Sequence, residues 1–95
     1  MVIRMLNFEA DPQYKAEAVE AIGNILPKIK SLDGCENALF LTHEDRKFSL
    51  LVFWKSREHA EAAAGIIGPQ LLPVLGKIAK GPVTPVLYEV HESSN

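Results

Sequence analysis

The chain has 95 residues, of which 47% are hydrophobic, and its net charge is −2. This length suffices for one domain with a packed core and is too short for two. The balance of charge and the lack of a basic stripe in the sequence argue against a nucleic-acid surface. The single cysteine, Cys35, cannot form a disulfide within the chain, which fits a reducing compartment.

The most apolar part of the sequence is shorter than a membrane span. The longest run without a charged residue covers residues 62–76, and it contains glycines and two prolines. A helix that crosses a bilayer needs about 20 apolar residues. Arg4 and Glu9 interrupt the apolar N-terminal run, which argues against a signal peptide. We therefore expect a soluble, cytoplasmic protein that makes no membrane contact.

The N-terminal third predicts a strand followed by a helix. Residues 2–9 form a strand pattern in which both faces are largely apolar. Asp11 is a suitable N-cap and Pro12 a suitable first helical residue. Apolar residues then recur at helical spacing as far as Ile29. Pro27 removes one backbone donor, so we expect a kink or an early end of the helix there.

A hairpin is predicted in the middle of the chain. Asp33-Gly34 is a turn signal that closes the helix. Residues 36–43 and 48–54 form two strand patterns separated by the polar turn "EDRK". The second of these strands contains "LLVF", which is apolar on both faces.

The last third predicts a broken helix and a final strand. Ser56 is a good N-cap for a helix in "REHAEAAA". Gly65, Gly68 and Pro69 are expected to interrupt that helix, and a second short helix is expected to end near Gly81-Pro82. Residues 83–90 form a fourth strand pattern, and a polar tail, "HESSN", follows. Pro85 inside this strand predicts an edge position, where a missing donor is tolerated.

This order of elements predicts an α+β, ferredoxin-like βαββαβ fold. Its four-stranded antiparallel sheet, with strand order four-one-three-two, has both helices on one face. Because the third strand is apolar on both faces, the second face of the sheet also needs a cover. An uncovered apolar face favours aggregation. We therefore expect a homodimer that packs sheet against sheet.

Three segments carry a resemblance to a known family. These are the turn "LDGC" (32–35), the strand-to-helix passage "LLVFWKSREHAEA" (50–62) and the closing strand "PVLYEV" (85–90). With this layout, the chain resembles the antibiotic biosynthesis monooxygenase-like domains of the dimeric α+β barrel superfamily. The resemblance covers nearly the whole chain and implies a single domain over residues 1–95. It implies cofactor-free oxidation of phenolic or quinol-type substrates by dioxygen.

The same superfamily implies a haem-degrading alternative. Such enzymes resemble one another in a strand-one asparagine, a strand-three tryptophan and a helix-two histidine ligand. Trp54 matches the tryptophan position and Asn7 is a candidate for the asparagine. The sequence departs from the pattern at the ligand, because no histidine lies between Ile66 and Lys80. His59 lies earlier, in the first turn of the helix.

The predicted topology tests which side chains meet. Antiparallel pairing places the end of the third strand beside the start of the first. Trp54 is therefore expected near Arg4, Tyr88, His91 and either Cys35 or Asn37. Asn7 is expected at the opposite end of the sheet, about 20 Å away. Histidines are spread over both ends, and no short-spaced metal-binding motif occurs, so no metal site is expected.

Five residues are candidates for the site, each with a structural alternative. Arg4 and His59 are candidate catalytic residues: a guanidinium orients anionic oxygens, and an imidazole suits acid–base chemistry. The alternative for Arg4 is an ion pair with Glu89 or another carboxylate, and the alternative for His59 is a solvated position on a polar helix turn. Trp54, Asn7 and Tyr88 are candidate substrate-binding residues. Their alternatives are core packing for the two aromatic residues and satisfaction of a buried backbone group for the asparagine.

The sequence thus favours three functions in order. The first is a cofactor-independent monooxygenase acting on a small phenolic or quinol-type substrate in a pocket between sheet and helices. The second is a non-catalytic homodimeric module that binds a small aromatic or apolar molecule or only assembles. The third is a haem-degrading enzyme. No cofactor is expected for the first two.

Overall fold

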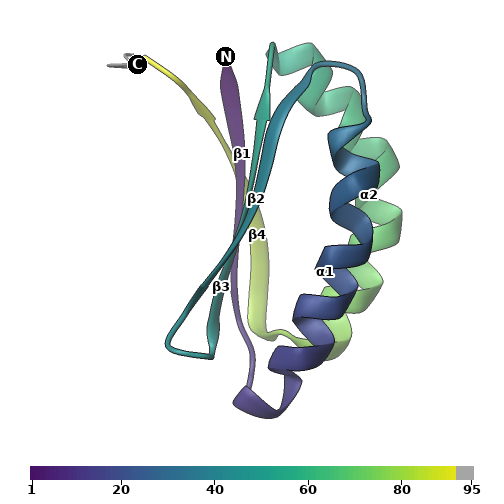
Figure 1. Ribbon diagram of the computed structural model, residues 1–95. Coiled ribbons are helices and arrows are strands. Elements are labelled where there is room, and N and C mark those ends of the chain that lie inside the picture. Colours follow the sequence, from purple (N-terminus) through teal and green to yellow (C-terminus); the bar gives the residue numbers. More distant parts are fainter. Residues whose placement is uncertain (92–95) are drawn as a thin grey trace.

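The secondary-structure elements follow the predicted order. The computed structural model describes residues 1–91, so residues 92–95 of the predicted polar tail lie outside the described part. Two helices lie on the same side of one sheet (Figure 1). The elements are β1 (Val2–Glu9), the 3₁₀ turn η1 (Pro12–Tyr14), α1 (Lys15–Lys30), β2 (Cys35–His43), β3 (Lys47–Trp54), α2 (Arg57–Ile78) and β4 (Lys80–Glu89).

The sheet has the predicted strand order. Its four strands are arranged β2-β3-β1-β4, and every neighbouring pair is antiparallel. β4 is therefore an edge strand, which confirms the position inferred from Pro85. In register, Pro85 lies opposite Leu6 of β1. The central strands β1 and β3 are joined from Val2 opposite Trp54 to Glu9 opposite Lys47.

The two faces of the sheet have different surroundings. The inner face, which the helices cover, carries the buried side chains of the central strands: Val2, Leu6, Phe8, Phe48, Leu50, Val52 and Trp54. Phe48 stacks on Phe8, with ring centroids 5.1 Å apart. Four helical isoleucine and alanine residues of α1 and five residues of α2 complete this core: Ala18, Ile22, Ile25, Ile29, Ala60, Ala63, Leu71, Leu75 and Ile78.

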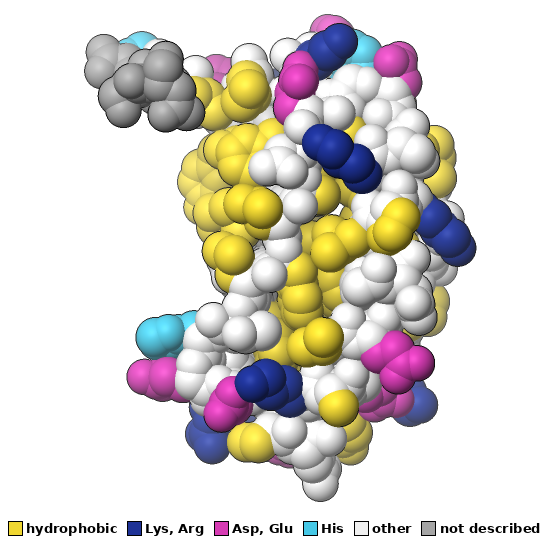
Figure 2. All heavy atoms as spheres, in the orientation of Figure 1, with side chains coloured by type: hydrophobic (Ala, Val, Ile, Leu, Met, Phe, Trp, Pro, Cys, Tyr) yellow, Lys and Arg dark blue, Asp and Glu magenta, His cyan; other side chains and the backbone are white. Residues whose placement is uncertain are grey.

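The outer face of the sheet, which points away from the helices, is apolar and uncovered within the chain. Leu39, Leu41, Val86 and Tyr88 are between 39% and 49% exposed, and all four lie on this face. Figure 2 shows hydrophobic side chains gathered on the strand side of the molecule, at the left of the view. The apolar second face that the sequence predicted is therefore present.

α2 is one continuous helix, so the predicted interruption at Gly65, Gly68 and Pro69 is wrong. The helix contains both Pro69 and Pro73. Each proline deprives the carbonyl four residues earlier of its donor, and these carbonyls belong to Gly65 and Pro69. Both prolines and Gly65 are exposed, so water can serve the freed carbonyls. The buried Leu71 holds the second half of the helix against the core.

α1 likewise passes through its proline. It continues to Lys30 with Pro27 inside it, so the helix does not end early there. Pro27 and Gly23, whose carbonyl loses its donor, are both exposed. The predicted start is displaced, because Pro12 opens the 3₁₀ turn and the α-helix begins at Lys15. No helix within residues 1–91 is long and apolar enough to cross a membrane.

Candidate functional site

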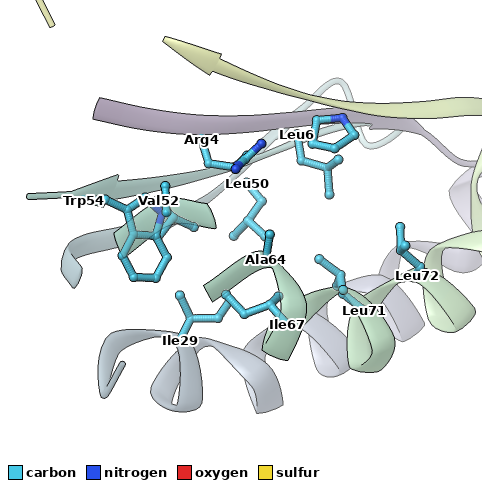
Figure 3. Close-up of a pocket in the computed structure, with 13 residues that line it drawn as sticks. Arg4, Leu6, Ile29, Leu50, Val52, Trp54, Ala64, Ile67, Leu71 and Leu72 are labelled. Atoms are coloured by element: carbon cyan, nitrogen blue, oxygen red, sulfur yellow. The ribbon is translucent and has the colours of Figure 1, made fainter. Parts of the chain in front are cut away.

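A cavity lies between the inner face of the sheet and helix α2. Its volume is about 200 Å³. Figure 3 shows side chains from the strands facing side chains from the helices across it. The lining residues are Arg4, Leu6, Ile29, Leu50, Val52, Trp54, Ala60, Ala64, Ile67, Gly68, Leu71, Leu72 and Pro85.

Small residues on α2 leave this space open. Ala60, Ala64 and Gly68 follow one another at four-residue intervals, so they lie on one side of the helix. All three line the cavity. Over about two turns the helix therefore presents no side chain larger than a methyl group along this line. Leu72, one further turn along, is the first large residue of the series; it also lines the cavity and is 53% exposed.

Trp54 forms one wall of the cavity. It is the last residue of β3, and its side chain is 1% exposed. It lies opposite Val2 on one side and Cys35 on the other, at the end of the sheet predicted from the topology. Trp54 is thus both a core residue and a cavity residue.

Arg4 is the charged residue of the cavity. It points from β1 toward the inner face, between Val52 of β3 and Leu87 of β4. Among the described residues that line the cavity, it alone carries a charge. The alternative of an ion pair between Arg4 and Glu89 is not found; Glu89 Oε1 lies 3.4 Å from Arg57 Nη2 instead. Within residues 1–91, Arg4 makes no side-chain hydrogen bond and no ion pair.

His59 lies outside the cavity, at the start of α2. Its Nδ1 is 2.7 Å from the Ser56 hydroxyl, and its Nε2 is 3.5 Å from Asp33 Oδ2. Ser56 is the N-cap of α2, as predicted, and its hydroxyl also accepts from the His59 backbone N–H at 3.3 Å. The ring packs on Gly34, whose φ of +82° suits glycine. The imidazole thus links the turn before β2 to the start of α2.

Asn7 and Tyr88 belong to the outer face. Asn7 is exposed, and its Oδ1 accepts a hydrogen bond from Ser49 Oγ at 2.5 Å. Tyr88 lies opposite Ile3 in register and is 49% exposed. The structure therefore brings Arg4 and Trp54 together in the cavity. Asn7 and Tyr88 lie on the other face of the sheet.

Several cavity residues were not identified from the sequence. Ala64, Ile67 and Gly68 line the cavity from α2, and Leu50 lines it from β3. Figure 3 shows Ala64 and Ile67 on the helix side and Leu50 on the strand side. The four-residue spacing of small side chains was a signal for this groove. Gly65, Gly68 and Pro69 also predict a break in the helix, and a broken helix would not align these small residues.

The two shifted pKa values lie away from the cavity. Burial raises the pKa of the Cys35 thiol, an effect that the nearby Lys30 opposes. At the β2–β3 turn, the hydrogen bond and charge of Lys15 lower the pKa of Asp45. Among residues 1–91, no three histidine, cysteine or acidic side chains come together as a metal-binding group.

Comparisons with known proteins give matches at the level of structure. No family model matches the sequence, and no curated protein matches it. A candidate antibiotic biosynthesis monooxygenase from Deinococcus radiodurans is 19% identical, with a TM-score of 0.87 over 100% of this chain and 97% of that one. Rv0793 from Mycobacterium tuberculosis is 16% identical, with a TM-score of 0.82 over 99% and 98% of the two chains.

A third similar structure has a stated activity. A variant of SnoaB, a cofactor-independent oxygenase from Streptomyces nogalater, is 15% identical and has a TM-score of 0.77 over 98% of this chain and 95% of that one. The TM-scores establish the fold, and at identities this low the similarity shows the fold alone. They confirm at that level the resemblance drawn from residues 32–35, 50–62 and 85–90. The chain therefore has the ferredoxin-like α+β fold of structures described as antibiotic biosynthesis monooxygenases.

Proposed function

We propose that the protein is a cofactor-independent monooxygenase that oxidises a small phenolic or quinol-type substrate with dioxygen. The observation that carries this proposal is an apolar cavity with a single cationic side chain, Arg4, beside the wall formed by Trp54. The fold that the chain shares with a cofactor-independent oxygenase supports the choice of chemistry.

In this reaction the substrate supplies the electrons. A phenol that loses its proton becomes an electron-rich phenolate, which can reduce dioxygen directly. One oxygen atom then replaces hydrogen on a ring carbon to form a quinone, and the other leaves as water. The protein contributes a site that excludes water and a fixed positive charge that stabilises the phenolate. Arg4 is the group that does this, because a guanidinium remains charged and presents directed donors.

Oxygen uptake by cavity variants tests this proposal. Ala64→Leu adds bulk at a position that lines the cavity, whereas Ala62→Leu adds the same bulk at a position of the same helix that does not line it. A panel of phenols and hydroquinones should give oxygen uptake and an oxygenated product mass above the protein-free background. Ala64→Leu and Trp54→Ala should lose this activity, and Ala62→Leu should keep it. Equal uptake by all proteins would refute the proposal.

The assembly proposed for the protein is a homodimer that packs outer face against outer face. This packing would cover Leu39, Leu41, Val86 and Tyr88, which one chain leaves exposed. A contact surface of this kind is the apolar type that permanent dimers use.

Mass measurement in solution tests the dimer. The wild type at micromolar concentration should have twice the 10.5 kDa mass of one chain. Leu51→Asp, in the centre of the outer face, should give a monomer. Val19→Asp, at an exposed position of α1, should leave the dimer intact. A wild-type protein with the mass of a single chain would contradict the proposal.

A second function is a binding module without catalysis. It is favoured by the lack of a general base among the described cavity residues, where Arg4 is the one ionisable side chain. Specific binding of the same aromatic compounds without oxygen uptake would select it. Haem degradation has less support, because no histidine lines the cavity within residues 1–91 and His59 is engaged with Ser56.

A further inference from the structure

We propose that the cavity selects ligands that are anionic when bound: a single aromatic ring whose carboxylate or phenolate oxygen lies against the guanidinium of Arg4. This inference deepens the proposed function, because it names the charge and size of the substrate. It rests on the same cavity as that function, and it does not depend on turnover.

The first argument is the unpaired charge of Arg4. Arg4 is a partly buried residue, and it shares the cavity with uncharged side chains. The carboxylate nearest in the strand pairing is Glu89, on the inner face of the neighbouring strand, and it is paired with Arg57 instead. A partly buried cation without a counter-charge is unfavourable in apolar surroundings. An anionic ligand supplies the missing counter-charge, whereas a neutral ligand would further desolvate the cation.

The second argument is the form of the donor group. A guanidinium presents its N–H donors in a planar fork, which matches the two oxygens of a carboxylate. A phenolate offers one oxygen to the same fork. The rest of the cavity, from Leu6 and Leu50 to Trp54, presents apolar surface to the ring. One end of the ligand is thus expected to be charged and the remainder apolar.

The third argument is size. The cavity has a volume of about 200 Å³. An apolar cavity of about 150 Å³ accommodates benzene, and cavities for drug-sized ligands begin at about 300 Å³. This volume therefore suits one substituted ring. Ala60, Ala64 and Gly68 set the limit on the helix side, because any larger side chain there would occupy the space of the ring.

Trp54 provides the readout for the test. It is the single tryptophan of the chain and it lines the cavity, so its fluorescence reports ligand entry. Two matched pairs separate charge from shape: benzoate with benzamide, and pentafluorophenolate with hexafluorobenzene. The first pair examines a carboxylate and the second a phenolate. Titrations of wild type, Arg4→Met and Arg4→Lys complete the experiment.

The expected result is a charge preference that depends on Arg4. The wild type should bind at least one anion about tenfold or more tightly than its neutral partner, as expected for a hydrogen bond between charged groups. Arg4→Met should lose that preference while still binding the neutral compounds. Arg4→Lys should keep part of it, and should lose more for benzoate because a lysine has no fork.

Three results would overturn the inference: equal binding of anions and neutral partners by the wild type, an unchanged preference in Arg4→Met, or no binding of either pair. If Arg4→Met does not fold, the preference of the wild type alone decides. The two proposals fail separately. Anion-selective binding without oxygen uptake would refute the monooxygenase, and oxygen uptake with neutral quinols but no anion preference would refute this inference.

Discussion

Substitution of Gly34 by alanine tests the contact between the β2 turn and the start of α2. Gly34 has φ +82°, and an added Cβ would overlap the His59 ring and lie 2.7 Å from its Cβ. A left-handed conformation costs an alanine about 1–2 kcal/mol, of which a reduced unfolded-state entropy returns about 0.4–1 kcal/mol. Displacement of the ring also breaks its hydrogen bond to Ser56, which contributes about 0.5–1.5 kcal/mol.

The expected loss for Gly34→Ala is therefore about 1–3 kcal/mol in the free energy of unfolding. The contact between the His59 ring and Asp33 adds little to this loss, because the Asp33 carboxylate is 98% exposed. Gly81→Ala is the matched control. Gly81 has φ +89°, but an added Cβ there would meet nothing within 4 Å. This control should lose only the conformational part, about 1 kcal/mol.

Urea denaturation followed by circular dichroism measures both losses. The double substitution Gly34→Ala with His59→Ala isolates the ring. Once the ring is absent, the cost of Gly34→Ala should fall toward that of Gly81→Ala, and the remaining difference is the 2.7 Å contact with the Cβ that alanine keeps at position 59. Equal losses for the two single glycine variants, or a loss for Gly34→Ala that His59→Ala leaves unchanged, would refute the role assigned to the histidine.

Three further predictions concern the β2–β3 turn and the thiol. Glu44 has φ +55°, a left-handed conformation that is strained for a residue with a side chain. Glu44→Gly should therefore raise the free energy of unfolding by about 0.5–1 kcal/mol, measured by urea denaturation, and a lower free energy of unfolding would contradict this strain. Lys15 lowers the pKa of Asp45, so this carboxylate stabilises the fold above its unfolded pKa, and the effect disappears as the pH falls through the lowered value. Asp45→Asn should therefore be less stable than wild type at neutral pH but not in acid, and a difference that persists in acid would contradict this. Burial raises the pKa of Cys35, so its reaction with a thiol reagent near neutral pH should be slower than that of a free cysteine; an equal rate would contradict it.

The sheet and one end of the site could be predicted from the sequence. Alternating apolar residues fix which side chains share a face, and antiparallel order fixes which strand ends meet. These two rules were enough to bring Trp54 and Arg4 together and to place Asn7 at the opposite end. They depend on pattern and connectivity, and not on the details of side-chain packing.

The remaining features depend on contacts between distant segments. Gly65, Gly68 and Pro69 predicted a break in α2. The prolines of the helix are exposed, so water can replace the lost bonds, and the buried side keeps the helix intact. The partner of Glu89 is Arg57, which approaches from the first turn of α2 rather than from the neighbouring strand. His59 is held by a turn whose path depends on the positive φ of Gly34. No local pattern carries this information.

A crystal structure of the protein with a bound substrate of the oxygen-uptake panel tests the central claim most directly. We predict that the ring lies in the cavity between Trp54 and the Ala64 side of α2, with its anionic oxygen within hydrogen-bonding distance of the Arg4 guanidinium. A substrate bound on the outer face of the sheet, or in the cavity with its oxygen directed away from Arg4, would contradict the account.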